Sequence, residues 1–126
     1  MAAKKKILIV EDEVMIVKVL SIRLESLGYK IAAAYDGEEG LAMVKKEKPD
    51  LIILDVGLPR IDGNTLCGLI KADPATKHIR VIMLTGKKLV GDMETSFSAG
   101  ADLYMNKPYE WPRLVAHLHE LLGEPK

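Results

Sequence analysis

The chain has 126 residues, of which 48% are hydrophobic and 29% are charged, a composition typical of a single globular domain. Eighteen basic residues balance eighteen acidic ones, and this net charge of +0 argues against a general binder of nucleic acids or membrane surfaces. No apolar run is long enough to span a bilayer, and the single cysteine cannot form a disulfide within the chain, so we expect a cytoplasmic protein.

Short apolar segments alternate along the chain with longer segments that carry apolar residues at helical spacing. Glycine and proline mark several helix ends, with Gly28 after the first helix and Pro49 after the second. In chain order, the expected elements are a strand at 6–10, a helix at 14–27, a strand at 30–34, a helix at 38–48, a strand at 51–54, a helix at 64–71, a strand at 81–84, a helix at 91–98, a strand at 103–105 and a helix at 112–122.

Most of the strand segments are near-continuous apolar runs, as expected for parallel strands that are covered on both faces. Five strands alternating with five helices imply right-handed crossovers and a doubly wound α/β sheet. No linker, repeat or low-complexity segment divides the chain, so residues 1–126 are expected to form one domain. In such a sheet, ligands bind beyond the carboxyl ends of the strands, and the residues directly after the strands are the candidates for function.

Charged and hydroxyl side chains follow four of the expected strands. Glu11 and Asp12 follow the first, Asp55 the third, Thr85 the fourth and Lys107 the fifth. Three acidic groups at one sheet edge repel one another, and a hard divalent cation such as Mg²⁺ would relieve that repulsion. With Mg²⁺ and an ammonium to neutralise phosphoryl oxygens, a carboxylate can attack a phosphoryl group. We therefore predict that Asp55 is a phosphoacceptor, with Lys107 and Thr85 beside it.

Each of these residues also has a structural interpretation. The acidic run 11–13 can cap the helix that follows it, Thr85 can cap a strand end, and Lys107 can be a surface lysine. It is the joint occurrence of all four positions that favours phosphoryl chemistry. Elsewhere, Gly63 is expected to adopt a positive φ before the third helix, and Cys67 to be a small core residue.

The sequence resembles the CheY-like receiver family, the phosphoacceptor domains of two-component response regulators. The segments that match the family span nearly the whole chain in the family order: 7–13, 54–59, 62–63, 83–85, 99–104 and 106–109. The resemblance implies a flavodoxin-like parallel sheet with strand order 2-1-3-4-5. It also implies a phosphorelay switch in which Asp55 accepts a phosphoryl group from a sensor histidine kinase or a histidine phosphotransfer protein.

For the metal, the resemblance implies that Asp12, Asp55 and the backbone carbonyl of Gly57 hold Mg²⁺, with Glu11 acting through water. Glu11 departs from the more frequent aspartate of the family, and Gly57 lacks the side chain usual at its position. Neither change removes a required group.

For signalling, the resemblance assigns Thr85 and Lys107 to phosphoryl binding and Tyr104 to the switch aromatic. The output face would be formed by the helix at 91–98, the strand at 103–105 and the last helix. A downstream effector, an output domain and a phosphorylation-dependent homodimer all remain open as partners of this face, with no direct contact to nucleic acid or membrane.

Three other classes of protein are alternatives to a phosphoacceptor domain. An aspartate-nucleophile phosphatase of the haloacid dehalogenase type would carry a second aspartate where this chain has Gly57, so we expect no enzyme beyond self-phosphorylation and autodephosphorylation. A flavodoxin-like protein would bind an anionic cofactor after the first strand, and the acidic run 11–13 would repel such a cofactor. An adaptor that is never phosphorylated can be distinguished only by assay.

Overall fold

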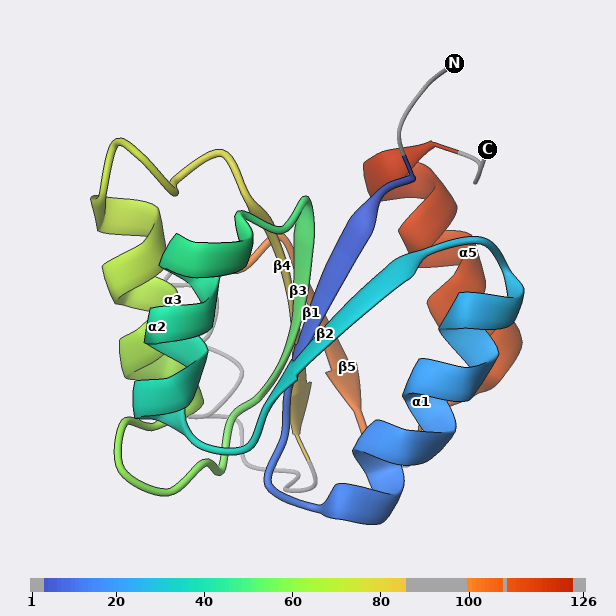
Figure 1. The fold of residues 1–126 in the computed structure, drawn as a ribbon, viewed down its shortest axis with the longest axis horizontal. Helices are drawn as coiled ribbons and strands as arrows, with labels where there is room; N and C mark the ends of the chain where they lie inside the picture. The colour runs from blue at the N-terminus through green and yellow to red at the C-terminus, as the bar shows by residue number, and fades with distance from the viewer. Residues whose placement is uncertain (1–3, 86–99, 108, 124–126) are drawn as a thin grey trace.

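The computed structural model describes residues 4–85, 100–107 and 109–123, which form a three-layer α/β fold (Figure 1). In the described residues, five parallel strands pair in the order β2-β1-β3-β4-β5, which confirms the predicted fold class and strand order. The strands are β1 (Lys6–Val10), β2 (Lys30–Ala34), β3 (Leu51–Asp55), β4 (Arg80–Thr85) and β5 (Leu103–Asn106).

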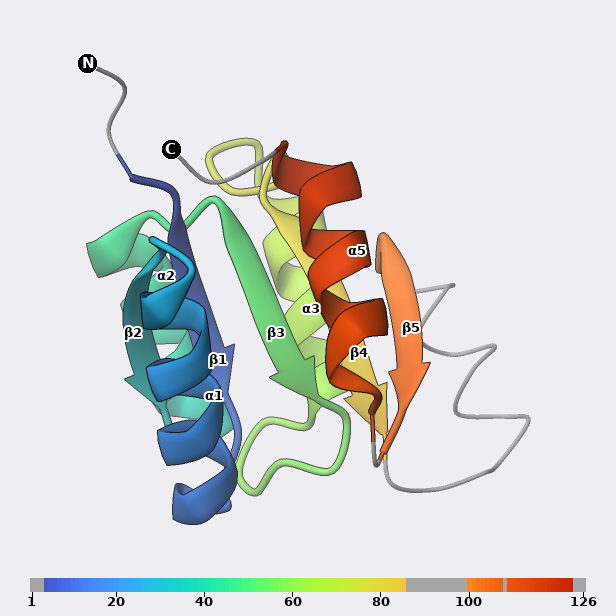
Figure 2. The same cartoon turned by 90° about the vertical axis from the view of Figure 1, so that its right-hand side faces the viewer.

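Helices cover both faces of the sheet. The helices of the described residues are α1 (Val14–Ser26), α2 (Gly37–Glu47), α3 (Gly63–Ala72) and α5 (Trp111–Leu122). Figures 1 and 2 show α1 and α5 on one face and α2 and α3 on the other. The helix expected at 91–98 lies outside the described residues. Within the described part of the chain, every helix is too short or too polar to cross a membrane.

The core consists of two apolar clusters, one on each face of the sheet. Successive side chains of a strand point to opposite faces, so Ile7 and Ile9 join the cluster under α1 and α5, while Leu8 and Val10 join the one under α2 and α3. All four are fully buried. This double burial explains why the strand segments are continuous apolar runs. Cys67 is buried in the second cluster, as predicted, and burial raises the pKa of its thiol to about 11.

The glycine and proline positions in the sequence predicted the helix ends correctly, but the conformation expected at one glycine differs. Gly28 follows α1 with a φ of 100°, and Lys48 ends α2 in the left-handed region before Pro49. The expected positive φ at Gly63 is wrong, because Gly63 is the first residue of α3. A glycine is required there for close approach instead: a Cβ atom would lie 2.2 Å from the Asp55 carbonyl oxygen.

Candidate functional site

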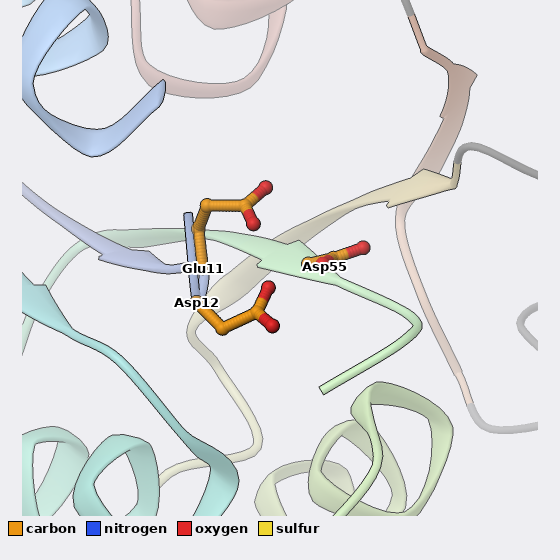
Figure 3. Close-up of side chains that lie close together, drawn as sticks. All are labelled: Glu11, Asp12 and Asp55. Carbon is orange, nitrogen blue, oxygen red and sulfur yellow. The ribbon is translucent and has the colours of Figure 1, made fainter. Parts of the chain in front are cut away.

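The carboxyl ends of β1 and β3 bring three acidic side chains together. The strands pair in parallel register, with Val10 opposite Leu54, so the residues that follow β1 lie beside the end of β3. Figure 3 shows the side chains of Glu11, Asp12 and Asp55 lying close together at this edge. One oxygen from each lies within 4.8 Å of the others. Glu11 is 2% exposed and Asp55 is 8% exposed, whereas Asp12 is open to solvent.

Lys107 brings a positive charge to the same cluster. Its ammonium Nζ lies 2.5 Å from Glu11 Oε1 and 3.5 Å from Asp55 Oδ2. The Lys107 backbone N–H donates to the Thr85 carbonyl oxygen, which fixes the lysine at the end of β5 beside the end of β4. The predicted site residues of the first, third and fifth strands are therefore brought into contact.

The electrostatics of the cluster keep Lys107 charged. Burial alone would lower the pKa of the Lys107 ammonium, but the hydrogen bond to Glu11 and the charge of Asp55 outweigh burial and raise it. Burial raises the pKa of the Glu11 carboxyl, and the hydrogen bonds from Lys107 and the Glu13 N–H offset this only in part. Three carboxylates thus share one ammonium, which leaves an excess of negative charge at neutral pH.

The backbone around Asp55 is held in place on two sides. The Val56 N–H donates to the Leu84 carbonyl, and the Val56 carbonyl accepts from the Gly63 N–H. The Gly57 N–H donates to Asp55 Oδ1 at 3.3 Å. Because α3 begins directly against this strand end, the backbone of Asp55 has little room to shift at the sheet edge.

Thr85 and Tyr104 lie on neighbouring strands and point to the same face of the sheet. Tyr104 pairs in register with Met83, and Thr85 is two residues further along β4, so pleating turns all three side chains to one side. Thr85 is 2% exposed, and Tyr104 is partly buried against the cluster under α2 and α3. The structure therefore places the predicted hydroxyl at the site edge and the predicted aromatic on the adjacent strand.

Two features of the site were not predicted. One is the direct contact between Glu11 and Lys107, because nothing in the sequence shows which carboxylate the lysine prefers. The other is an apolar groove of about 630 Å³ beside the site, lined by Met15, Ile16, Val19, Arg23, Lys107, Tyr109 and Trp111. Its sequence signal was available: Met15 and Val19 are apolar, lie four residues apart on α1 and are both exposed.

A side-chain contact joins α1 to the start of α5 at this groove. The Arg23 guanidinium carbon lies 5.1 Å from the centroid of the Trp111 ring, which is a cation–π contact. Trp111 also packs partly buried against the core cluster under α1 and α5. Arg23 and Trp111 are 88 positions apart in the sequence, on α1 and α5, and both line the groove together with Lys107.

Comparison with known proteins assigns the family. The chain matches the response regulator receiver domain over residues 7–119. The DNA-binding dual master transcriptional regulator RpaA of Synechocystis sp. is 39% identical over 117 residues, which cover 93% of this chain and 48% of that protein. The chain spans about half the length of the curated relatives it matches.

Solved structures agree in fold. A CheY-like response regulator receiver domain protein from Methanospirillum hungatei JF-1 superposes with a TM-score of 0.87 at 33% identity, over 94% of this chain and 93% of that one. The receiver domain of the sensor histidine kinase PA1611 from Pseudomonas aeruginosa PAO1, which has a magnesium ion coordinated in its active-site cleft, gives a TM-score of 0.87 at 31% identity, over 97% of this chain and 100% of that one. The chain therefore belongs to the receiver-domain family of two-component response regulators, as its motifs predict.

Proposed function

We propose that this receiver domain is a phosphorylation-dependent switch in which Asp55 accepts the phosphoryl group. The observation that supports it best is the meeting of Asp55 with Asp12, Glu11 and Lys107 at the carboxyl edge of the sheet. An Asp55 oxygen would attack the phosphorus of the donor and form an acyl phosphate while the donor's leaving group departs. Lys107 would then pair with a phosphoryl oxygen, and the Thr85 hydroxyl would donate to another.

The donor set at the site suits Mg²⁺. Asp12 and Asp55 would supply carboxylate oxygens and Gly57 its backbone carbonyl, with Glu11 acting through water. All are hard oxygen ligands, and a divalent cation balances the excess negative charge of the three carboxylates. When bound, the ion neutralises phosphoryl oxygens during transfer. The magnesium ion in the cleft of the PA1611 receiver domain supports this assignment.

The phosphodonor is proposed to be a sensor histidine kinase or a histidine phosphotransfer protein. The apolar groove on α1 supports a protein donor, because it lies beside Lys107 and exposes Met15 and Val19 to solvent. Contacts in this groove would hold the donor while its phosphohistidine reaches Asp55. No turnover of an external substrate is proposed beyond self-phosphorylation and autodephosphorylation, because Gly57 stands where a phosphatase would need a second carboxylate.

The output is proposed to pass from Thr85 to Tyr104. A phosphoryl group that draws the Thr85 hydroxyl inward favours one packing of the neighbouring strand over another, through contacts that exist only in the phosphorylated state. Tyr104 lines a cavity of about 480 Å³ with Tyr109, Arg113 and His117, at the junction of β5 and α5. An effector, an output domain or a second receiver would bind there and on the helix expected at 91–98, which lies outside the described residues.

Phosphorylation itself is the direct test. Incubation of the protein with acetyl phosphate and Mg²⁺ should add one phosphoryl group, measured by intact-protein mass spectrometry. Asp55→Asn should abolish the addition, while Glu38→Gln, which changes an exposed carboxylate of α2 outside the cluster, should leave it unchanged. Persistence of the same labelling in Asp55→Asn would reject Asp55 as the acceptor.

A further inference from the structure

The lysine of the site is held by the glutamate rather than by the nucleophile. Lys107 Nζ lies 2.5 Å from Glu11 Oε1, a charge-assisted hydrogen bond, but 3.5 Å from Asp55 Oδ2, which is at the outer limit of hydrogen bonding. The Lys107 side chain is 17% exposed, so water competes weakly for its ammonium. The resting position of this ammonium is therefore decided by the two carboxylates.

Both oxygens of Glu11 have partners. While Oε1 accepts from Lys107, Oε2 accepts from the Glu13 backbone N–H at 3.1 Å. The Glu11 side chain is 3% exposed, and Glu11 directly follows Val10, which is fully buried in β1. A carboxylate held at both oxygens and at its backbone has a fixed direction, so it defines where Lys107 rests.

The length of the glutamate side chain matters for this contact. An aspartate at position 11 would withdraw its carboxylate by about 1.5 Å, the length of one C–C bond. At that length, Lys107 or the backbone at position 11 would have to move by a similar distance for both contacts to persist. The short contact between Glu11 and Lys107 therefore depends on the glutamate at position 11, where aspartate is more frequent in the family.

We propose that Glu11 is a positioning residue that holds Lys107 nearer to itself than to the Asp55 carboxylate in the resting state, an inference that rests on the proposed phosphorylation of Asp55. Lys107 then contacts Asp55 only at the longer distance of 3.5 Å, and it lies within one short movement of the phosphoryl group. Phosphorylation transfers the ammonium from Glu11 to a phosphoryl oxygen. Without Glu11, Lys107 pairs with Asp55 and must be displaced before the nucleophile can react.

The first test uses metal-free protein and does not depend on phosphorylation. The Cε–Hε signal of Lys107 and the carboxyl carbon of Asp55 are followed by NMR in EDTA on protein labelled with ¹³C in its lysine and aspartate residues. They are assigned by their loss in Lys107→Arg and in Asp55→Asn. Glu11→Gln should move the Lys107 signal, and the Asp55 carboxyl carbon should shift with it. Glu11→Asp should give an intermediate position, and Glu38→Gln should change neither signal. An unmoved Lys107 signal in Glu11→Gln overturns the proposal.

The second test separates positioning from metal binding. At saturating Mg²⁺, Glu11→Gln should slow phosphorylation of Asp55 by acetyl phosphate about tenfold, the effect of one charge-assisted hydrogen bond. Glu11→Asp should recover part of the rate. In a Lys107→Met background, Glu11→Gln should have almost no further effect, because both changes act through the same contact.

The outcomes distinguish the two hypotheses. If Glu11→Gln slows Lys107→Met protein as much as it slows the wild type, Glu11 acts on the metal and not through Lys107, and the inference fails. If the wild type itself is not phosphorylated at Asp55, the proposed function fails instead, and the metal-free NMR result still decides the placement of Lys107. Thermal unfolding of each variant confirms that it is folded before either test.

Discussion

At the scale of single residues, two glycines of α3 have opposite surroundings. A Cβ atom on Gly63 would lie 2.2 Å from the Asp55 carbonyl oxygen and 2.8 Å from the Val56 Cα. These are backbone atoms of the strand end that carries the proposed phosphoacceptor, so they cannot turn aside as a side chain can. On Gly68, five residues later in the same helix, a Cβ atom would meet nothing within 4 Å. Close contact, not chain flexibility, explains the first glycine.

Alanine at these two positions should therefore change stability in opposite directions. Gly63→Ala should lower the free energy of unfolding by about 2 kcal/mol or more, because the added methyl group forces α3 away from β3. Gly68→Ala should raise it by about 0.5 to 1 kcal/mol, because alanine favours a helix interior. Urea unfolding followed by circular dichroism measures both. Equal effects at the two positions would contradict the contact distances on which the prediction rests.

At the scale of elements, Asp102 joins α3, β4 and β5 at the end of the sheet opposite the site. Its carboxylate accepts from Lys71 Nζ at 2.9 Å and from the Val81 N–H at 2.8 Å, and Lys71 also donates to the Ile79 carbonyl. Burial alone would raise the pKa of the Asp102 carboxyl, but the hydrogen bonds from Lys71 and the Val81 N–H outweigh it and lower the pKa. The ionised form is therefore the one that stabilises the fold.

The sign of the pH dependence follows from this lowered pKa. Above the ordinary aspartate pKa of about 3.9, the contribution of Asp102 is fully present, and it is lost as pH falls through the lower folded-state value. Asp102→Asn should cost about 2 kcal/mol at pH 7, because Lys71 loses its charged partner. Unfolding curves at pH 7 and in this acidic range should show the cost shrinking toward low pH. Glu38→Gln, which changes an exposed carboxylate, serves as the control. If Asp102→Asn lowered the free energy of unfolding equally at pH 7 and at acidic pH, the stabilising role of ionised Asp102 would be contradicted.

A second element-scale feature is the two-sided apolarity of α1. Val17, Leu20 and Leu24 are buried against the sheet, while Met15 and Ile22 are 67% and 64% exposed on other sides of the helix. Met15 lines the groove beside Lys107, and Ile22 does not. These two residues provide a matched pair for locating the proposed donor surface.

Met15→Ala should slow phosphotransfer from a histidine-containing donor protein several-fold, because it removes apolar contact in the groove. Phosphorylation by acetyl phosphate should stay unchanged, since the small donor needs no groove. Ile22→Ala, with similar exposure, should affect neither reaction. Neither change should alter the free energy of unfolding by more than about 0.5 kcal/mol. Radiolabelled transfer from the donor measures the rates, and equal slowing with acetyl phosphate would argue against a docking role.

At the scale of the whole molecule, the sheet register links the site to the far strand. Thr85 and Tyr104 point to one face from neighbouring strands, and the Lys107 N–H is bonded to the Thr85 carbonyl. We therefore expect a movement at the end of β4 to reach the end of β5 through this hydrogen bond. The expected connection between the phosphorylation site and β5 is short, because it runs through one backbone hydrogen bond between neighbouring strands.

Beryllofluoride, which mimics a phosphoryl group, should expose this coupling. On adding it with Mg²⁺, NMR shifts should appear at Asp12, Asp55 and Lys107, and also at Tyr104 and the first turn of α5. Thr85→Ala should keep the shifts near Asp55 and suppress those at Tyr104. Shifts that stay confined to the site in the unmodified protein would contradict the coupling.

The elements were predictable because each depends on a local or nearly local pattern. The apolar runs of the strands and the glycines and prolines at helix ends placed both ends of every described element within one residue. The convergence of Asp55 with Glu11, Asp12 and Lys107 was also predicted, because parallel strands share one carboxyl edge. The positive φ at Gly63 was not borne out, because a glycine in a loop sequence does not reveal whether conformation or contact requires it.

By itself, the sequence determined the fold class, the strand order through its family resemblance, and the sheet edge at which the acidic, hydroxyl and ammonium groups meet. Only the tertiary structure decided that Lys107 lies nearer to Glu11 than to Asp55, at nitrogen–oxygen distances of 2.5 Å and 3.5 Å. It also decided that α3 presses on the Asp55 backbone and that α1 and α5 enclose an apolar groove. These are differences in packing distance between elements remote in sequence, and residue patterns specify which elements form but not how closely their side chains approach.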